Sequence, residues 1–196
     1  MGDPICKWRK VSTKNVIEIV SWLPKQPCLE NDYKTQLRLL GPKLGNAFLR
    51  TGCQLSCQLG LQYVDKSGIF HPRFDHDITE NEAKDYLKHW ITKYYVPNPY
   101  TKMGFKKINQ PVILLYAIAD IAARRNELHH LEDICNTIFG EQTGNLVNVK
   151  NMLCDFSSII HIRTDFNVSA NNQNIPDYHV YNDRNDKQAF FDFFNG

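Results

Sequence analysis

The stretch that decides the fold is ITENEAKDYLKHWITKYYVPNPYTKMGFKKINQPVILLYAIADIAARRNELHHLEDICNTIFG, residues 78–140. It opens with Thr79 and Glu82 at the spacing of a capping box, in which two side chains satisfy the free amides at a helix start. Apolar residues then recur on one helical face: Ala83, Tyr86, Leu87, Trp90, Ile91 and Tyr94. Val96-Pro97 ends this helix, and Pro111 begins a second, almost continuously apolar one. A third, amphipathic helix follows. The stretch therefore predicts three helices, with a lysine-rich loop between the first and the second.

The N-terminal side of this stretch predicts short helices over residues 16–23 and 32–40, the second ended by Gly41-Pro42. Residues 53–63 alternate apolar and polar, which is typical of a strand. Leu59-Gly60-Leu61, however, has the pattern of a helix that closes on a glycine and passes into a strand. We favour a helix to about Leu59, a strand over 61–64, a turn over 65–68 and a strand over 69–74.

The C-terminal side repeats this order. The apolar residues Leu146, Val149, Leu153 and Phe156 predict a helix. The segments IIHIR (159–163) and YHVYND (178–183) are expected to pair as strands across an Asn-rich loop. Three helices followed by a hairpin is the order of a winged helix, and it occurs twice.

The predicted fold is therefore mainly α with small β-hairpins (α+β), arranged as tandem winged-helix domains. We expect an N-terminal domain over residues 1–78 and a connecting helix and basic loop over 79–110. A C-terminal domain is expected over 111–196.

Composition indicates a folded chain without a membrane segment. Of the 196 residues, 42% are hydrophobic and 12% aromatic, enough to form an interior. The longest apolar run, residues 111–123, is interrupted by Asp120 and falls short of the roughly 18 residues that a membrane helix needs. The first ten residues lack the apolar core of a secretion signal, so we expect a cytoplasmic location.

Charge is distributed unevenly along the chain. Residues 1–125 hold 19 lysines and arginines against 11 acidic residues, whereas residues 126–196 hold 4 against 10. A basic front half favours an anionic partner, and an acidic back half favours a different one. Random variation of the surface is the alternative.

Duplex DNA is the expected anionic partner. In a winged helix the third helix usually enters the major groove, and the hairpin lies along the backbone. The polar faces of the two third helices comprise Lys43, Asn46, Arg50 and Gln54 in the first domain and Asn145, Asn148, Lys150 and Asn151 in the second. The expected phosphate contacts are Lys34, Arg38, Lys66, Arg73, Lys102, Lys106 and Lys107. The alternative is that these are solvated polar faces.

Four phenylalanines near the C-terminus must be covered by something. Phe190, Phe191, Phe193 and Phe194 fall within five residues, and together they would make an exposed apolar patch. Packing on the chain's own core is the simpler explanation, and docking on a partner subunit is the alternative, which makes these four residues the candidate partner-binding site.

The sequence offers no clear catalytic or metal site. Glu82-Ala83-Lys84 after Asp75 and Asp77 matches the spacing of metal-dependent nucleases, but Glu82 already has a role in helix capping. A zinc site at Cys53 and Cys57 with two downstream histidines lacks the usual spacing. We therefore expect reduced thiols, no catalytic residue, no metal and no cofactor.

Four segments carry a family resemblance: DIT (77–79), WITKYYVPNPYT (90–101), INQPVILLYAIADIA (108–122) and LHHLEDICNTIFG (128–140). Together with the preceding LGLQYVDKSGIF (59–70), they resemble the recognition region of type IIS restriction and nicking endonucleases. Those enzymes also carry a separate cleavage domain, which this sequence does not supply. The resemblance implies a recognition or scaffold subunit of a bacterial restriction or anti-phage complex.

A separately encoded nuclease or ATPase subunit would then do the chemistry. We expect a non-enzymatic chain that binds duplex DNA in that complex. The alternatives are a winged-helix adaptor that binds proteins and has little affinity for DNA, and a divergent metal-dependent nuclease.

Overall fold

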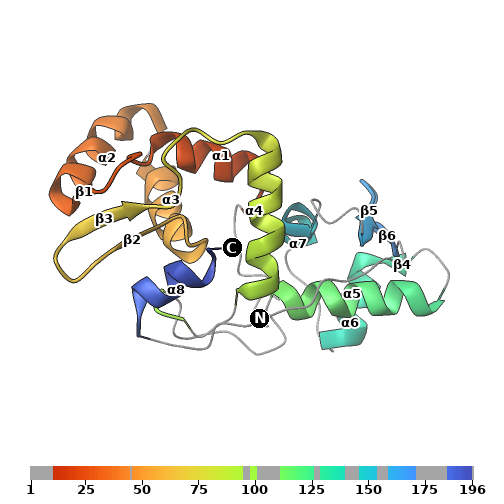
Figure 1. Ribbon diagram of the computed structural model, residues 1–196. Helices are drawn as coiled ribbons and strands as arrows, with labels where there is room; N and C mark the ends of the chain where they lie inside the picture. Colours follow the sequence, from red (N-terminus) through yellow and green to blue (C-terminus); the bar gives the residue numbers. More distant parts are fainter. Residues whose placement is uncertain are drawn as a thin grey trace. The chain divides into compact units, whose positions relative to one another are not determined.

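The computed structural model describes residues 11–44, 46–94, 98–100, 111–125, 129–139, 146–153, 159–170 and 185–195. The side chains of residues 40–44, 46–51, 111–113, 125, 139 and 148 lie outside this description. The described residues form eight helices and two small antiparallel sheets of three strands each (Figure 1). The fold is therefore mixed α and β, as expected. No helix among these residues is both long enough and apolar enough to cross a bilayer.

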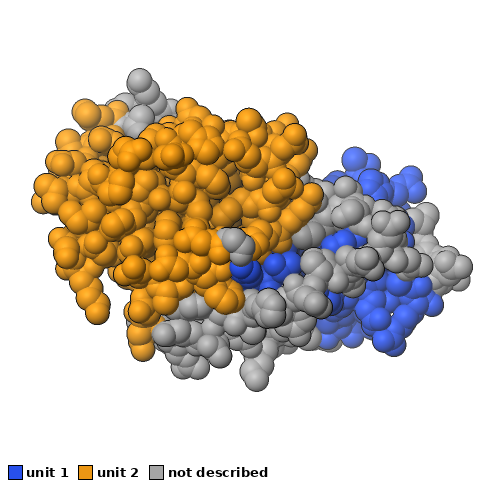
Figure 2. All heavy atoms as spheres, viewed as in Figure 1, with its two compact units in different colours: residues 1–12, 91–95, 104–180 blue, residues 13–90, 96–103, 181–196 orange. Residues whose placement is uncertain are grey.

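The chain divides into two units that interleave along the sequence. Unit 1 comprises residues 1–12, 91–95 and 104–180, and unit 2 comprises residues 13–90, 96–103 and 181–196 (Figure 2). This division differs from the expected boundaries at residues 78 and 110, because the C-terminal segment is grouped with the N-terminal helices. The cause is apolar burial: Phe190 and Phe194 are 0% and 2% exposed.

Unit 2 contains a helix, a short strand, two helices and a hairpin, followed by two further helices. In chain order these are α1 (Thr13–Trp22), β1 (Cys28–Leu29), α2 (Glu30–Leu44), α3 (Asn46–Gln58), β2 (Gln62–Val64), β3 (Ile69–Pro72), α4 (Glu80–Lys93, in unit 2 up to Trp90) and α8 (Lys187–Phe193). The strands pair in the order β1-β3-β2, so β3 is the central strand. Its residue Phe70 lies opposite Cys28 of β1 on one side and opposite Val64 of β2 on the other. The first strand therefore pairs with the last one.

Unit 1 has the same order of elements. These are α5 (Pro111–Arg125), β4 (His129–His130), α6 (Leu131–Phe139), α7 (Leu146–Leu153), β5 (Ile160–Ile162) and β6 (Asn167–Ala170). Its strands pair as β4-β6-β5, with His129 opposite Val168 and Ile162 opposite Val168. A helix–strand–helix–helix–strand–strand order thus occurs twice, each time with the first strand paired to the last.

Local sequence signals account for most of these elements. The capping box at the start of α4 is confirmed: the Thr79 amide donates to Glu82 Oε2 at 2.8 Å, and the Glu82 amide donates to Thr79 Oγ1 at 3.3 Å. All six residues of the predicted apolar face are buried. α3 ends at Gln58 and is closed by Gly60, whose φ is 66°, while the Leu61 amide donates to the Ser56 carbonyl at 2.8 Å. This Schellman closure resolves the ambiguity over residues 53–63 in favour of a helix followed by a strand.

The predicted end of the second helix was wrong in position. α2 does not end at Gly41-Pro42 but continues to Leu44. A glycine before the proline helps here, because it has no Cβ and so removes part of the clash by which proline disfavours a helical predecessor. In unit 1, β5 pairs with β6, across a turn over residues 163–166. The segment expected as its partner, residues 178–183, lies outside the described residues.

Candidate nucleic-acid interface

The turn between β2 and β3 is built around the Asp65 carboxylate. Asp65 Oδ1 accepts the amides of Ser67 at 2.8 Å and Ile69 at 2.9 Å, and Oδ2 lies 2.9 Å from His71 Nε2. The hydrogen bond from His71 and those from the turn amides lower the pKa of Asp65. Gly68 completes the turn at a φ of 77°, where glycine is favoured. We call residues 65–68 the wing turn, and it leaves Lys66 exposed.

The start of α2 lies against the wing turn. The Glu30 amide donates to the Gly68 carbonyl at 2.9 Å, so the first turn of the helix is fixed next to this loop. Lys34 lies one helical turn further along, and its ammonium pairs with Glu30 Oε1 at 2.8 Å. Arg38 follows one turn later on the same face, and both cations are exposed. We call Lys34, Arg38 and Lys66 the cationic edge of unit 2.

Gln54 is the one member of the predicted α3 face whose side chain is described, and it is exposed. Lys43, Asn46 and Arg50 lie on α2 and α3, but their side chains fall outside the described part of the structure. Lys102, Lys106 and Lys107 lie outside it altogether. The predictions for these six residues therefore remain predictions.

Arg73 was expected to contact phosphate, and the structure corrects this assignment. Its guanidinium donates to the Gly60 carbonyl at 2.9 Å and also to the Phe191 carbonyl and Asn195 Oδ1. The same group lies 3.9 Å from the centroid of the Phe191 ring. Burial lowers the pKa of Arg73, and the nearby Tyr86 and Asp192 offset this shift in part. Arg73 therefore ties α8 to the rest of unit 2, and its guanidinium donates within the chain.

The phenylalanine cluster packs on the chain's own core, the simpler of the two explanations, and its assignment to a partner surface is corrected. Phe190, Phe191 and Phe194 are buried within unit 2, whereas Phe193 is half-buried. The Phe190 ring lies 5.0 Å from that of Phe194 and 5.6 Å from that of Tyr100. The chain itself covers these rings, because the C-terminal segment returns to the core of unit 2.

The corresponding helix of unit 1, α7, carries the second predicted polar face. Lys150 is half-exposed, and its ammonium lies 5.3 Å from the centroid of the Phe166 ring. Asn151 is exposed. The side chain of Asn148 and all of Asn145 fall outside the described residues. α7 therefore offers one described cation, which lies over an aromatic ring.

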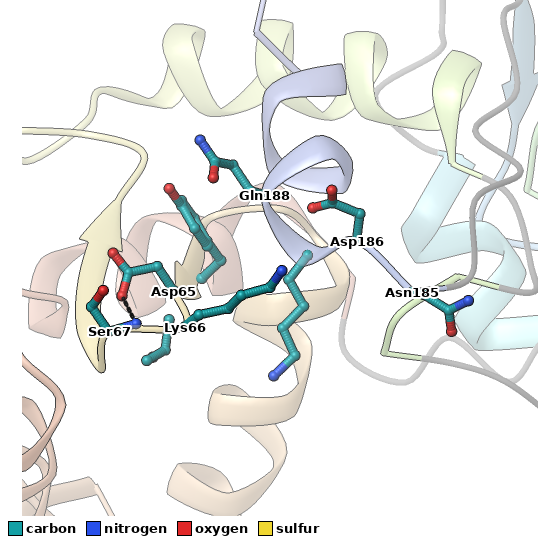
Figure 3. Close-up of a pocket in the computed structure, with 9 residues that line it drawn as sticks. Asp65, Lys66, Ser67, Asn185, Asp186 and Gln188 are labelled. Carbon is teal, nitrogen blue, oxygen red and sulfur yellow. Dashed lines mark hydrogen bonds between the residues drawn. The ribbon is translucent and has the colours of Figure 1, made fainter.

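A cavity of about 670 Å³ lies between the wing turn and the start of α8 (Figure 3). Its walls include Lys66 and Lys187, and also Asp65 and Asp186. Asp186 caps α8 by accepting the Ala189 amide at 2.9 Å. The charges in the cavity balance, so it favours neither an anion nor a cation.

The carboxylates that match the nuclease spacing are engaged in local structure. Glu82 accepts from Thr79 and contacts His76 Nε2 at 3.1 Å, while Asp77 pairs with Lys25 at 2.7 Å. Lys84 pairs with Glu80, one turn earlier on α4. No three His, Cys, Asp or Glu side chains within the described ranges are grouped to hold a metal ion. The arrangement is thus that of a capped helix start.

The cysteines of unit 2 are protonated thiols at neutral pH. Burial is the main cause that raises the pKa of Cys28, Cys53 and Cys57, in the last case to about 12. All three are free, and Gln62 Nε2 donates to Cys57 Sγ at 3.1 Å. Such thiols are poor nucleophiles and poor metal ligands.

The capping box predicts a specific pH dependence of stability. Hydrogen bonds from Thr79 and then His76 lower the pKa of Glu82 from 4.5 to about 2. Its stabilising contribution is therefore complete above about pH 4.5 and is lost as the pH falls towards 2. We expect Glu82→Gln to lower the free energy of unfolding at pH 6, with the difference from wild type shrinking between pH 4.5 and 2.

Urea denaturation across this pH range measures the effect. Glu80→Gln is the matched control, because Glu80 makes only an exposed ion pair, which contributes little to stability. An equal, pH-independent loss for both variants would contradict the assignment of Glu82 to the cap.

Comparison with known proteins identifies no relative, since no family model, curated protein or solved structure matches the chain. Sequence reasoning anticipated the exposed cations of the edge. It also predicted the turn over residues 65–68, but it missed His71 as a partner of the Asp65 carboxylate.

Proposed function

We propose that both units are winged-helix domains and that unit 2 binds duplex DNA through its cationic edge and α3. The repeated order of elements supports the first part, because a winged helix places its first strand beside the last strand of the hairpin. Two units of this kind suit a non-catalytic recognition or scaffold subunit of a bacterial restriction or anti-phage complex. A separate nuclease or ATPase subunit would supply the chemistry.

The observation that carries the DNA-binding proposal is the placement of the cationic edge. The bond between the Glu30 amide and the Gly68 carbonyl brings the wing turn and α2 together, so Lys34, Arg38 and Lys66 can follow one phosphate backbone. The ion pair of Lys34 with Glu30 is exposed, and such pairs are weak enough to be exchanged for phosphate. Lysine and arginine contacts to phosphate supply the sequence-independent part of DNA affinity.

Charge reversal of the cationic edge tests this proposal. We expect the triple variant Lys34→Glu, Arg38→Glu, Lys66→Glu to bind a short labelled duplex at least about 100-fold more weakly than wild type at low salt, since three phosphate contacts become repulsive. Fluorescence anisotropy with the full chain measures the affinity.

The matched control is Lys14→Glu, Lys88→Glu, Arg124→Glu, which makes the same change in net charge at three exposed positions elsewhere. It should retain most of the affinity. Equal losses in both variants would show that only net charge matters, and the proposed edge would then be wrong.

A protein-binding adaptor is the second candidate, and exposed apolar side chains favour it. Leu39 is 72% exposed and Leu29 56% exposed on unit 2, and Val147 is 58% exposed on α7. Large apolar side chains at such exposure are often covered by a partner when they cluster. The adaptor predicts no measurable duplex binding by the wild-type chain, which the same anisotropy experiment detects.

A further inference from the structure

The hairpin turns of the two units share the same pattern of backbone hydrogen bonds. In unit 2 the Asp65 amide donates to the Ile69 carbonyl at 2.9 Å, and the Gly68 amide donates to the Asp65 carbonyl at 3.1 Å. In unit 1 the Arg163 amide donates to the Asn167 carbonyl at 2.9 Å, and the Phe166 amide donates to the Arg163 carbonyl at 3.0 Å. Phe166 therefore occupies the position in its turn that Gly68 occupies in the wing turn.

The link to the following helix is repeated as well. The first residue of α6, Leu131, donates its amide to the Phe166 carbonyl at 2.8 Å, just as Glu30 of α2 donates to Gly68. This geometry requires a left-handed backbone at the last turn position. The φ values are 77° at Gly68 and 62° at Phe166.

A phenylalanine is an unfavourable choice at this position. A left-handed backbone brings a Cβ close to the following carbonyl, so glycine or asparagine normally occupies it. Phe166 is the one residue other than glycine with a positive φ in the described part of the chain. Strain of this kind persists where the side chain contributes something that glycine cannot.

The Phe166 ring lies beside a cation. The Lys150 ammonium lies 5.3 Å from the ring centroid, within the range of a cation–π interaction. The His130 ring approaches Phe166 with centroids 6.2 Å apart, and His130 Nδ1 accepts the Glu132 amide at the start of α6. The ring is thus fixed by the hairpin and by His130, while Lys150 in the last turn of α7 rests over it.

We infer that Phe166 is a positioning residue that holds the Lys150 ammonium in place for a phosphate of bound duplex DNA. The inference rests on the proposed function, and it adds a contact in unit 1 to the cationic edge of unit 2. Fixing a lysine before binding reduces the conformational entropy that the contact costs. The strain at Phe166 then has a functional reason.

Nuclear magnetic resonance of the full chain tests the geometry without DNA. The side-chain protons of Lys150 should show upfield ring-current shifts that persist in Phe166→Tyr and disappear in Phe166→Asn. Asparagine accepts the left-handed backbone, so the turn itself is preserved. Unshifted Lys150 protons in the wild type would overturn the inference.

A double-mutant cycle on duplex affinity tests the role. Lys150→Ala should weaken binding about three- to tenfold and reduce the log–log salt slope by about one unit. Phe166→Asn should weaken binding in the wild-type background and have no effect in the Lys150→Ala background, and Phe166→Tyr should retain the wild-type affinity.

The outcomes separate the two proposals. Additive effects of Lys150→Ala and Phe166→Asn would overturn the positioning role and leave the proposed function standing. A wild-type chain that binds no duplex would overturn the proposed function and the phosphate role together, even if the ring-current shifts are present.

Discussion

Phe190→Ala is expected to lower the free energy of unfolding by about 3–5 kcal/mol, the usual cost of emptying a fully buried aromatic site. Phe190 is 0% exposed, and its ring packs between those of Phe194 and Tyr100. Although it lies only six residues before Gly196, its side chain belongs to the core of unit 2. Urea denaturation followed by tryptophan fluorescence measures the change.

Phe193→Ala is the matched control for this prediction. Phe193 lies on the same short helix but is only half-buried, so its loss should cost about 1–2 kcal/mol. A Phe190→Ala variant as stable as wild type would contradict the packing of α8 and return the cluster to a partner surface.

Gly60→Ala is expected to cost about 2–5 kcal/mol, from about 1–2 kcal/mol of backbone strain plus about 1–3 kcal/mol of overpacking. The φ of Gly60 is 66°, where an L side chain is disfavoured. A Cβ would lie 2.7 Å from Phe194 Cδ2 and 3.2 Å from Tyr86 Oη. Tyr86 cannot easily move away, because its hydroxyl donates to the Leu59 carbonyl at 2.6 Å.

Gly68→Ala separates the two causes. Gly68 has a similar φ of 77°, but nothing lies within 4 Å of the position a Cβ would take. Gly68→Ala should therefore lower the free energy of unfolding only by the backbone strain, about 1–2 kcal/mol. Comparison of the two variants by urea denaturation gives the packing contribution, and equal losses would show that α8 does not lie against Gly60.

Elements with strong local signals were predicted well from the sequence. Thr79 and Glu82 predicted the start of α4, and Gly60 predicted the end of α3. Both predictions were possible because helix capping depends on residues only a few positions apart in the sequence. The wing turn was also predicted, since its aspartate and glycine satisfy a local geometry. Local chemistry determines each of these features.

Features that depend on distant parts of the chain were not predicted. β1 and β4 are two residues each, too short for any periodicity, and they exist only because a hairpin strand pairs with them. The return of α8 to unit 2 depends on residues more than a hundred positions away, including Arg73. The sequence therefore showed that the phenylalanine side chains must be buried, but it did not show which part of the chain or which partner buries them.

The candidate site was predicted in the same uneven way. Lys34, Arg38 and Lys66 were expected to contact phosphate, which stays a prediction, and the side chains of all three are exposed. Arg73 was misassigned because the sequence does not show whether a basic side chain faces solvent or donates to carbonyls within the chain, as Arg73 does. Phe166 gave no signal, since nothing in the sequence marks a left-handed backbone at a phenylalanine.

The salt dependence of duplex binding by the wild-type chain tests the central claim most directly. If the cationic edge of unit 2 contacts the phosphate backbone through three residues, the logarithm of the association constant should fall with the logarithm of salt concentration with a slope of about −3 or steeper. Anisotropy titrations between about 50 and 200 mM salt measure this slope. A slope near zero, or no binding at the lowest salt, would contradict the account.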